Sequence, residues 1–138
     1  MNILVIDGQG GRLGRQLIET IRRKIPGSRI TAIGTNAMAT AAMLKSGADD
    51  GATGENPVIV ACRSADVIVG PVGIVIADSL LGEVTPKMAV AVAQSSAARV
   101  LIPMNRCDNL VAGVTCQNFG DLVEDAVKKI ESCRKADQ

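Results

Sequence analysis

The chain opens with branched apolar residues at positions 3–6, followed by a glycine-rich turn and then by helical spacing. Consecutive apolar residues that end at glycines are typical of a strand buried on both faces of a sheet. Beyond the turn, Leu13, Leu17 and Ile21 recur at the spacing of one helix face, and Pro26 ends the helical pattern. The pattern predicts a strand, a turn and a helix, which is how a nucleotide-binding α/β fold begins.

Strands and helices are expected to alternate along the rest of the chain. Runs typical of strands lie at residues 29–33, 66–69, 99–102 and 110–115, with one more short strand expected within 47–57. Helical spacing covers residues 37–45, 87–97 and 118–133, whereas residues 58–64 and 74–81 fit a buried helix or a buried strand. We therefore expect an α/β single-domain Rossmann-like three-layer sandwich with a mainly parallel sheet over residues 1–138, with a frayed tail at residues 134–138.

The strand-to-helix turns of such a fold gather at one edge of the sheet, because the crossovers are right-handed. In this chain they are the segments 8–14, 34–36, 70–73 and 103–107, and the first three contain glycine. Open α/β sheets bind ligands at this edge, where the strand order reverses. An edge with so little side-chain bulk favours a binding site over four independent tight turns.

The turn after the first strand has glycines at the spacing Gly8-x-x-Gly11-x-x-Gly14. A helix start carries unpaired N–H groups and the positive end of the helix dipole, and glycine allows an anion to approach them closely. Leu13 does not fit the pattern Gly-x-Gly-x-x-Gly, and the turn instead resembles that of the extended and atypical short-chain dehydrogenase/reductases. The alternative is a tight connection that binds nothing.

The candidate ligand-binding residues all lie in these turns. They are Asp7, Gly8, Gly10, Gly11, Arg12, Gly14, Gly34, Thr35, Asn36, Gly70, Gly73, Asn105, Arg106 and Cys107. A dinucleotide fold carries an acidic residue for the ribose hydroxyls at the end of its second strand, and residues 33–37 contain none. With Arg12 in the glycine turn, we expect a small anionic or nucleotide ligand, and NADP rather than NAD if it is a dinucleotide.

Carboxylates and thiols near these turns have more than one interpretation. Asp7 could hydrogen-bond a ribose, or it could orient Mg²⁺ together with Asp78 and Glu83, but such carboxylates more often tie down turns, cap helices or face solvent, so we expect no metal. Arg106 could activate the neighbouring thiol of Cys107, yet an ordinary thiol is the better interpretation. The four cysteines are scattered singly and the chain has no histidine, which argues against a zinc site and fits a reducing compartment.

Composition excludes several classes of partner. The net charge is +1, and the chain contains one phenylalanine and no tryptophan or tyrosine, so neither a basic patch nor aromatic stacking for nucleic acid is expected. The apolar runs are too short to span a membrane, and the first residues enter a strand directly without a basic flank. We expect a cytoplasmic protein that binds neither nucleic acid nor membrane.

A second resemblance covers nearly the whole chain. The segments IDGQGG (6–11), GTNA (34–37), GATGEN (51–56), GPVGI (70–74) and NRC (105–107) together resemble a family of short, functionally uncharacterised bacterial proteins found largely in Gram-positive anaerobes. This resemblance implies no activity and no site residues. The resemblance to the reductases ends in the first half, because those enzymes use a tyrosine with a lysine four residues later and this chain has no tyrosine.

Three functions remain open. The first is a module that binds a nucleotide or dinucleotide and acts as a sensor or partner protein. The second is a small enzyme acting on a phosphorylated or carboxylated metabolite, with Asp7, Asn105, Arg106 or Cys107 in its site. The third is an oligomeric interaction protein without a small ligand, which the apolar helix faces favour. A homo-oligomer, with a homodimer as its simplest form, is expected for so small and apolar a chain.

Overall fold

The computed structural model describes residues 1–104, 109–115 and 118–136. Along the chain the elements are β1 (Asn2–Asp7), α1 (Arg12–Lys24), β2 (Arg29–Gly34), α2 (Ala37–Lys45), β3 (Asp50–Thr53), α3 (Glu55–Ala61), β4 (Val67–Pro71), the 3₁₀ helix η1 (Val72–Val75), α4 (Pro86–Gln94), β5 (Ala98–Ile102) and α5 (Phe119–Ala136). The strands form one five-stranded sheet in the order β3-β2-β1-β4-β5, with every pair parallel. This is the Rossmann strand order through its fifth strand, and the predicted fold class is confirmed.

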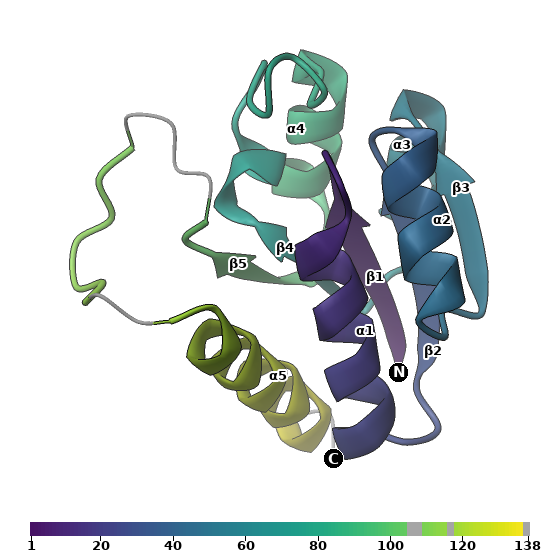
Figure 1. Ribbon diagram of the computed structural model, residues 1–138, viewed down its shortest axis with the longest axis vertical. Helices are drawn as coiled ribbons and strands as arrows, with labels where there is room; N and C mark the ends of the chain where they lie inside the picture. The colour runs from purple at the N-terminus through teal and green to yellow at the C-terminus, as the bar shows by residue number, and fades with distance from the viewer. Residues whose placement is uncertain (105–108, 116–117, 137–138) are drawn as a thin grey trace.

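Helices cover both faces of the sheet, which explains the unbroken apolar run of β1. Helices α1, α2 and α5 lie on one face, and α3 and α4 lie on the other (Figure 1). Successive strand residues point to opposite faces. Ile3 and Val5 therefore enter the core under α1 and α5, while Leu4 and Ile6 enter the core under α3 and α4.

Side-chain caps mark the starts of two helices. The Asn36 side chain accepts a hydrogen bond from the N–H of Ala39 at 2.9 Å and begins α2. Thr85 caps α4, with Pro86 as the first helical residue. Helix α3 begins earlier than predicted, after Gly54, so that Pro57 lies in its first turn, where no N–H donor is required.

Two segments predicted from their apolar content have a different structure. Residues 74–81 are neither a long helix nor a strand: η1 ends at Val75 and an irregular segment, residues 76–85, follows. Residues 110–115 are not a strand either, because Gly113 adopts a positive φ in a turn and Leu110 is 95% exposed. Both runs are apolar without period, and branched side chains do not form a strand unless a neighbouring strand pairs with them. Helix α5 also continues to Ala136, beyond the predicted end at Cys133.

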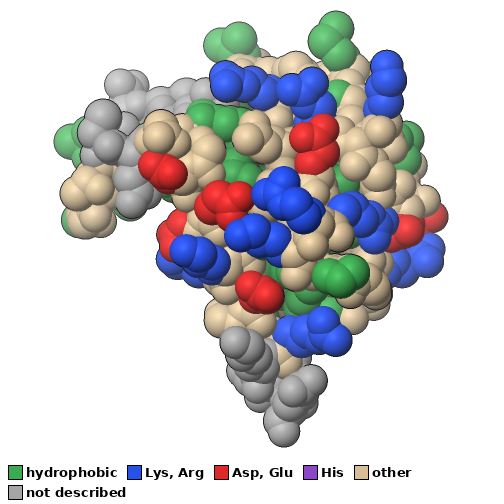
Figure 2. Space-filling view, turned by 60° about the horizontal axis from the view of Figure 1, so that its bottom comes forward, with side chains coloured by type: hydrophobic (Ala, Val, Ile, Leu, Met, Phe, Trp, Pro, Cys, Tyr) green, Lys and Arg blue, Asp and Glu red, His purple; other side chains and the backbone are tan. Residues whose placement is uncertain are grey.

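The described helices are too short or too polar to cross a lipid bilayer. On the face shown in Figure 2, lysine and arginine side chains are interspersed with aspartate and glutamate. Glu124 of α5 forms ion pairs with Arg23 and Lys24 of α1. These two ion pairs offset part of the positive charge at the end of α1.

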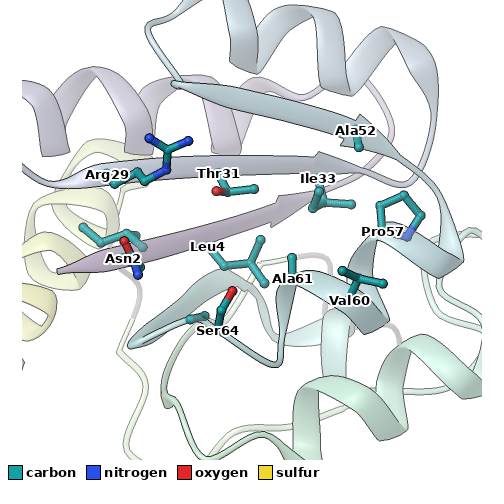
Figure 3. Close-up of a pocket in the computed structure, with 12 residues that line it drawn as sticks. Asn2, Leu4, Arg29, Thr31, Ile33, Ala52, Pro57, Val60, Ala61 and Ser64 are labelled. Atoms are coloured by element: carbon teal, nitrogen blue, oxygen red, sulfur yellow. The ribbon is translucent and has the colours of Figure 1, made fainter.

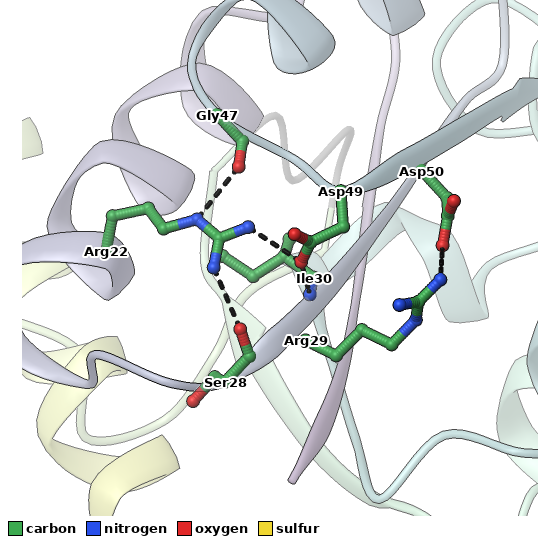
Figure 4. Close-up of polar contacts among 7 residues, drawn as sticks. All are labelled: Arg22, Ser28, Arg29, Ile30, Gly47, Asp49 and Asp50. Atoms are coloured by element: carbon green, nitrogen blue, oxygen red, sulfur yellow. Dashed lines mark hydrogen bonds and ion pairs between the residues drawn. The ribbon is translucent and has the colours of Figure 1, made fainter.

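The guanidinium of Arg22 joins the end of α1 to the start of β2 and to the segment before β3. Its nitrogens donate to the carbonyl oxygens of Gly47 and Ser28, each at 2.8 Å, and to Asp49 Oδ2 at 2.7 Å (Figure 4). The same carboxylate oxygen accepts the N–H of Ile30 at 2.8 Å. These hydrogen bonds, from Ile30 first and from Arg22 second, hold the pKa of Asp49 below its ordinary value.

This lowered pKa predicts a pH-dependent effect of replacing Asp49. The charged carboxylate stabilises the fold above the unfolded-state pKa of about 3.9, and that contribution disappears as the pH falls through the lower folded-state value. We expect Asp49→Asn to lower the free energy of unfolding at pH 7, and the gap to the unchanged protein to narrow below about pH 4. Urea unfolding between pH 7 and pH 3 measures the gap, and Asp125→Asn in an exposed ion pair of α5 is the control. A gap of equal size at both ends of this range would contradict the prediction.

Candidate functional site

The glycine turn lies at the carboxyl edge of the sheet, between β1 and α1. Strand β1 pairs with β2 on one side and with β4 on the other. The chain builds β2 and β3 outward on one side of β1, and β4 and β5 outward on the other. The turn therefore lies at the point where the strand order reverses, which is where open α/β sheets bind ligands.

Asp7 fixes the shape of this turn from the end of β1. The residue is 5% exposed, and its carboxylate accepts the N–H of Gly8 at 2.8 Å and the N–H of Gly14 at 2.7 Å. Gly14 is the third residue of α1, whose N-cap residue Gly11 supplies no side-chain cap, so Asp7 acts as the cap. Burial raises the pKa of Asp7, and the nearby Glu83 charge adds to the rise, although the backbone N–H groups oppose it. The carboxylate of Asp7 therefore ties down the turn, which is one of the interpretations offered by the sequence.

Glu83 reaches the other side of the turn from the segment 76–85. Its Oε1 atom accepts the N–H of Gln9 at 3.1 Å, the hydroxyl of Thr35 at 2.7 Å and Nδ2 of Asn36 at 2.6 Å. Burial works to raise the pKa of Glu83, but these hydrogen bonds outweigh it and leave the pKa below its ordinary value. Glu83 therefore bridges the ends of β1 and β2 and places a carboxylate where the sequence of β2 itself has none.

The segment that carries Glu83 has an unusual backbone. Asp78, Leu80 and Leu81 have positive φ values of 64°, 55° and 58°. Such conformations persist in non-glycine residues only where the surrounding structure holds them, and they cluster at functional sites. Here the N–H of Asp78 donates to the carbonyl of Val84 at 2.7 Å, and Leu80 is buried in the core under α3 and α4.

The side of the turn that faces α5 is open. A cavity of about 220 Å³ lies there, lined by residues 7–13, Met104 and Phe119. The guanidinium of Arg12 lies over the Phe119 ring, 4.3 Å from its centroid. Within the part of the chain that the structure describes, no acceptor receives the N–H of Gly10 or of Arg12. Two backbone donors at a helix start and one guanidinium therefore border this cavity.

Most of the predicted glycines make room for the chain itself. A Cβ added at Gly11 would lie 2.9 Å from Cα and 3.0 Å from the carbonyl oxygen of Ala39 in α2. The same close approach occurs at Gly8 (to Thr35 Oγ1), Gly14 (to Met43 Sδ), Gly34 (to the backbone nitrogen of Thr40), Gly70 (to the carbonyl oxygen of Ile6) and Gly73 (to Ser79 Oγ). Gly10 differs, because a Cβ there would meet no atom within 4 Å. Among the predicted turn glycines, Gly10 borders space that a ligand can occupy.

Two features of the sequence favoured NADP over NAD: Arg12 and the lack of an acidic residue at positions 33–37. The surroundings of both differ from those that the sequence indicated. Arg12 points toward α5 and stacks on Phe119, so its charge is not directed at the end of β2. At the end of β2, Thr35 and Asn36 hold the carboxylate of Glu83. Glu83 therefore brings negative charge to the end of β2, although positions 33–37 contain no acidic residue. The two features no longer support NADP over NAD.

The remaining candidates are placed as follows. Asn105, Arg106 and Cys107 lie outside the described residues. Asp7 and Glu83 come close to each other but bind N–H and O–H donors, and the described residues contain no group of three side chains suited to a metal ion. Met104 and Phe119 were not predicted as site residues. Phe119 has the spacing of the core-facing side of α5, and the same position also faces the turn.

A second hollow lies away from the predicted residues, on the face covered by α3. It is a groove of about 300 Å³ between α3 and strands β1, β2 and β3 (Figure 3). Leu4, Ile33 and Val60 contribute apolar side chains, and Arg29 and Thr31 lie toward the start of β2. The groove exists because α3 has seven residues and leaves part of the sheet uncovered. None of the residues predicted to bind a ligand lines it.

Two solved structures are similar to this one in architecture. One is a dodecameric FMN-dependent UbiX-like decarboxylase from Escherichia coli O157:H7, with 15% identity, coverage of 93% of this chain and 91% of that chain, and a TM-score of 0.44. The other is an NADPH-dependent quinone oxidoreductase from Escherichia coli, with 17% identity, coverage of 72% of this chain and 46% of that chain, and a TM-score of 0.41. These values show likeness of fold and carry no argument about ligand or assembly.

Sequence comparison gives the affiliation of the chain. None of the curated proteins matches it. The model of one family, described as a domain of unknown function, DUF3842, matches residues 2–135. The expected membership in an uncharacterised family is confirmed, and the chain belongs to the DUF3842 family.

Proposed function

We propose that this protein is a cytoplasmic nucleotide- or dinucleotide-binding module that acts as a sensor or partner protein. A phosphate of the ligand would occupy the cavity between the glycine turn and α5. The observation that carries the proposal is a pair of N–H groups, at Gly10 and Arg12, that have no acceptor among the described residues and belong to residues lining the cavity at the start of α1, as does the Arg12 guanidinium. Backbone N–H groups and a guanidinium are the donors that bind phosphate at helix starts.

The cavity supports binding better than catalysis. Asp7 is the only carboxylate among the described residues that line it, and both of its oxygens already accept backbone N–H groups. A general base needs a free oxygen within reach of the proton that it removes. The second candidate, an enzyme acting on a phosphorylated or carboxylated metabolite, would depend on Asn105, Arg106 or Cys107.

Ligand screening with the full chain tests the proposal. The natively purified protein is analysed by mass spectrometry for retained small molecules, and its thermal unfolding is measured with phosphate, AMP, ADP, NAD and NADP. A ligand at one hundred times its Kd stabilises a protein by about 2.7 kcal/mol. For a domain of this size we expect a rise in Tm of several degrees with at least one nucleotide. A protein that retains no nucleotide and shows no rise with any compound would refute nucleotide binding.

Exposed apolar side chains support a further alternative, an oligomeric interaction protein without a small ligand. Val60 of α3 and Val90 of α4 are 48% and 51% exposed on the same face of the sheet. Light scattering on the sample used for screening distinguishes the cases. A stable dimer together with no nucleotide response would favour this alternative over the module. A dimer that also binds a nucleotide would show that the protein is both an oligomer and a nucleotide-binding module.

A further inference from the structure

We infer that Glu83 accepts a hydrogen bond from the ribose of the bound nucleotide, and that the site takes nucleotides or dinucleotides whose ribose keeps its free 2′-hydroxyl. This inference rests on the proposed nucleotide-binding function and names the class of ligand. It follows from where Glu83 lies, from which of its oxygens is engaged, and from the charge that surrounds it.

The carboxylate of Glu83 lies between the glycine turn and the end of β2. In dinucleotide folds of this strand order, an acidic residue at the end of the second strand accepts hydrogen bonds from the ribose hydroxyls. In this chain Thr35 and Asn36 follow β2 directly, and both donate to Glu83. Gln9 of the glycine turn donates to the same atom. Glu83 therefore occupies, from a segment 47 residues further along the chain, the place between glycine turn and second strand that the ribose carboxylate requires.

The hydrogen bonding leaves one oxygen for a ligand. All three donors bind Oε1, whereas Oε2 accepts no hydrogen bond from the described residues. The three bonds fix the orientation of the carboxylate before any ligand arrives. An oriented carboxylate with a free oxygen is suited to accept hydroxyl groups, because a charged acceptor makes the stronger kind of hydrogen bond.

Local charge disfavours a phosphate at this place. None of the described lysines or arginines forms an ion pair with Glu83. The neighbouring carboxylate of Asp7 is close enough for its pKa to be raised by the charge of Glu83. Arg12, the cation of the glycine turn, lies on the Phe119 ring on the other side. Among the described residues, a 2′-phosphate would therefore meet the negative charge of Glu83 and no cation paired with it, whereas a ribose hydroxyl would meet an acceptor.

The test compares ligands that differ in the 2′-substituent. Binding of NADH and NADPH to the full chain is followed by their fluorescence, and ADP and adenosine 2′,5′-bisphosphate, which each carry two phosphates, are compared by calorimetry. We expect the 2′-hydroxyl ligand of each pair to bind at least about tenfold more tightly. Glu83→Gln keeps an oxygen for the three donors but loses the charge. In this variant we expect the affinity ratio between the two ligands of each pair to fall to about threefold or less.

A matched variant separates a specific role from a general charge effect. Asp78 lies in the same segment with an exposed side chain and a positive φ that asparagine tolerates, so Asp78→Asn removes a nearby charge with little disturbance. In Asp78→Asn, the affinity ratio between the two ligands of each pair should equal that of the unchanged protein. Equal or tighter binding of the 2′-phosphorylated ligands, or an unchanged ratio in Glu83→Gln, would overturn the inference and leave the proposed function standing. If no ligand of either pair binds, the proposed function fails and this inference fails with it.

Discussion

Replacing Gly11 with valine is expected to lower the free energy of unfolding by about 3 kcal/mol or more. Gly11 has a φ of 75°, and a left-handed conformation costs a residue with a side chain about 1–2 kcal/mol. The new side chain would also meet the backbone of Ala39 at 2.9 Å, so that α2 must move, and overpacking of this kind costs about 1–3 kcal/mol. Domains are stable by roughly 5–15 kcal/mol, so the loss is a large part of the total. Urea unfolding measures it.

The control for this experiment is an exposed alanine of the helix that Gly11 contacts. Ala41→Val adds the same side-chain atoms to the surface of α2 and should change stability by less than about 1 kcal/mol. If Gly11→Val unfolded at the same urea concentration as the control, then α2 would not lie against the glycine turn. Because of its effect on folding, Gly11→Val is a poor variant for testing ligand binding.

Gly10→Val is the variant expected to remove ligand binding and leave the fold intact. A Cβ at this position meets no atom within 4 Å, and Gly10 is absent from the glycines with positive φ. The valine side chain would stand at the edge of the cavity and keep a phosphate from the N–H groups of Gly10 and Arg12. A hydrogen bond to a charged group is worth about 1.5–3 kcal/mol, so losing two should weaken binding by about a hundredfold or more.

The measurement for Gly10→Val is calorimetric titration with the nucleotide that gives the largest thermal shift. The Tm without ligand should lie within about 2 °C of the unchanged protein, which shows that the loss is local. Ala41→Val, which lies outside the cavity, should bind the nucleotide normally. Unchanged affinity in Gly10→Val would place the ligand elsewhere, and the groove beside α3 would become the next candidate.

The parts of the fold that follow a regular hydrophobic period were predictable from the sequence. The helical spacing of α1 and α5 indicates one buried face, the caps Asn36 and Thr85 mark where helices begin, and the unbroken apolar run of β1, though without a period, ends at a glycine turn that marks it as a buried strand. Residues 74–81 and 110–115 are apolar without a period. In the first, Ile74 and Leu80 fill the core from an irregular backbone, which no local pattern encodes.

The arrangement of the turns that form the candidate site could be predicted in outline and less so in detail. Strand alternation places the turns at one edge of the sheet, and the structure brings Gly8, Thr35 and Asn36 together there. The role of Glu83 could not be predicted, because its partners lie 47 to 74 residues away in the chain. Spacing also cannot distinguish a glycine that admits a ligand from one that admits a neighbouring helix. That distinction between Gly10 and Gly11 depends on the path of α2.

The bonds made by Asp7 and Glu83 have a thermodynamic consequence for association. Both carboxylates hold the turn in one conformation beside the cavity of about 220 Å³. A ligand that enters the cavity meets preorganised donors, so the turn loses little conformational entropy when the ligand binds. The affinity of the cavity for a ligand then depends mainly on the hydrogen bonds that the ligand makes there. Even a small anion can gain most of the free energy that these hydrogen bonds provide.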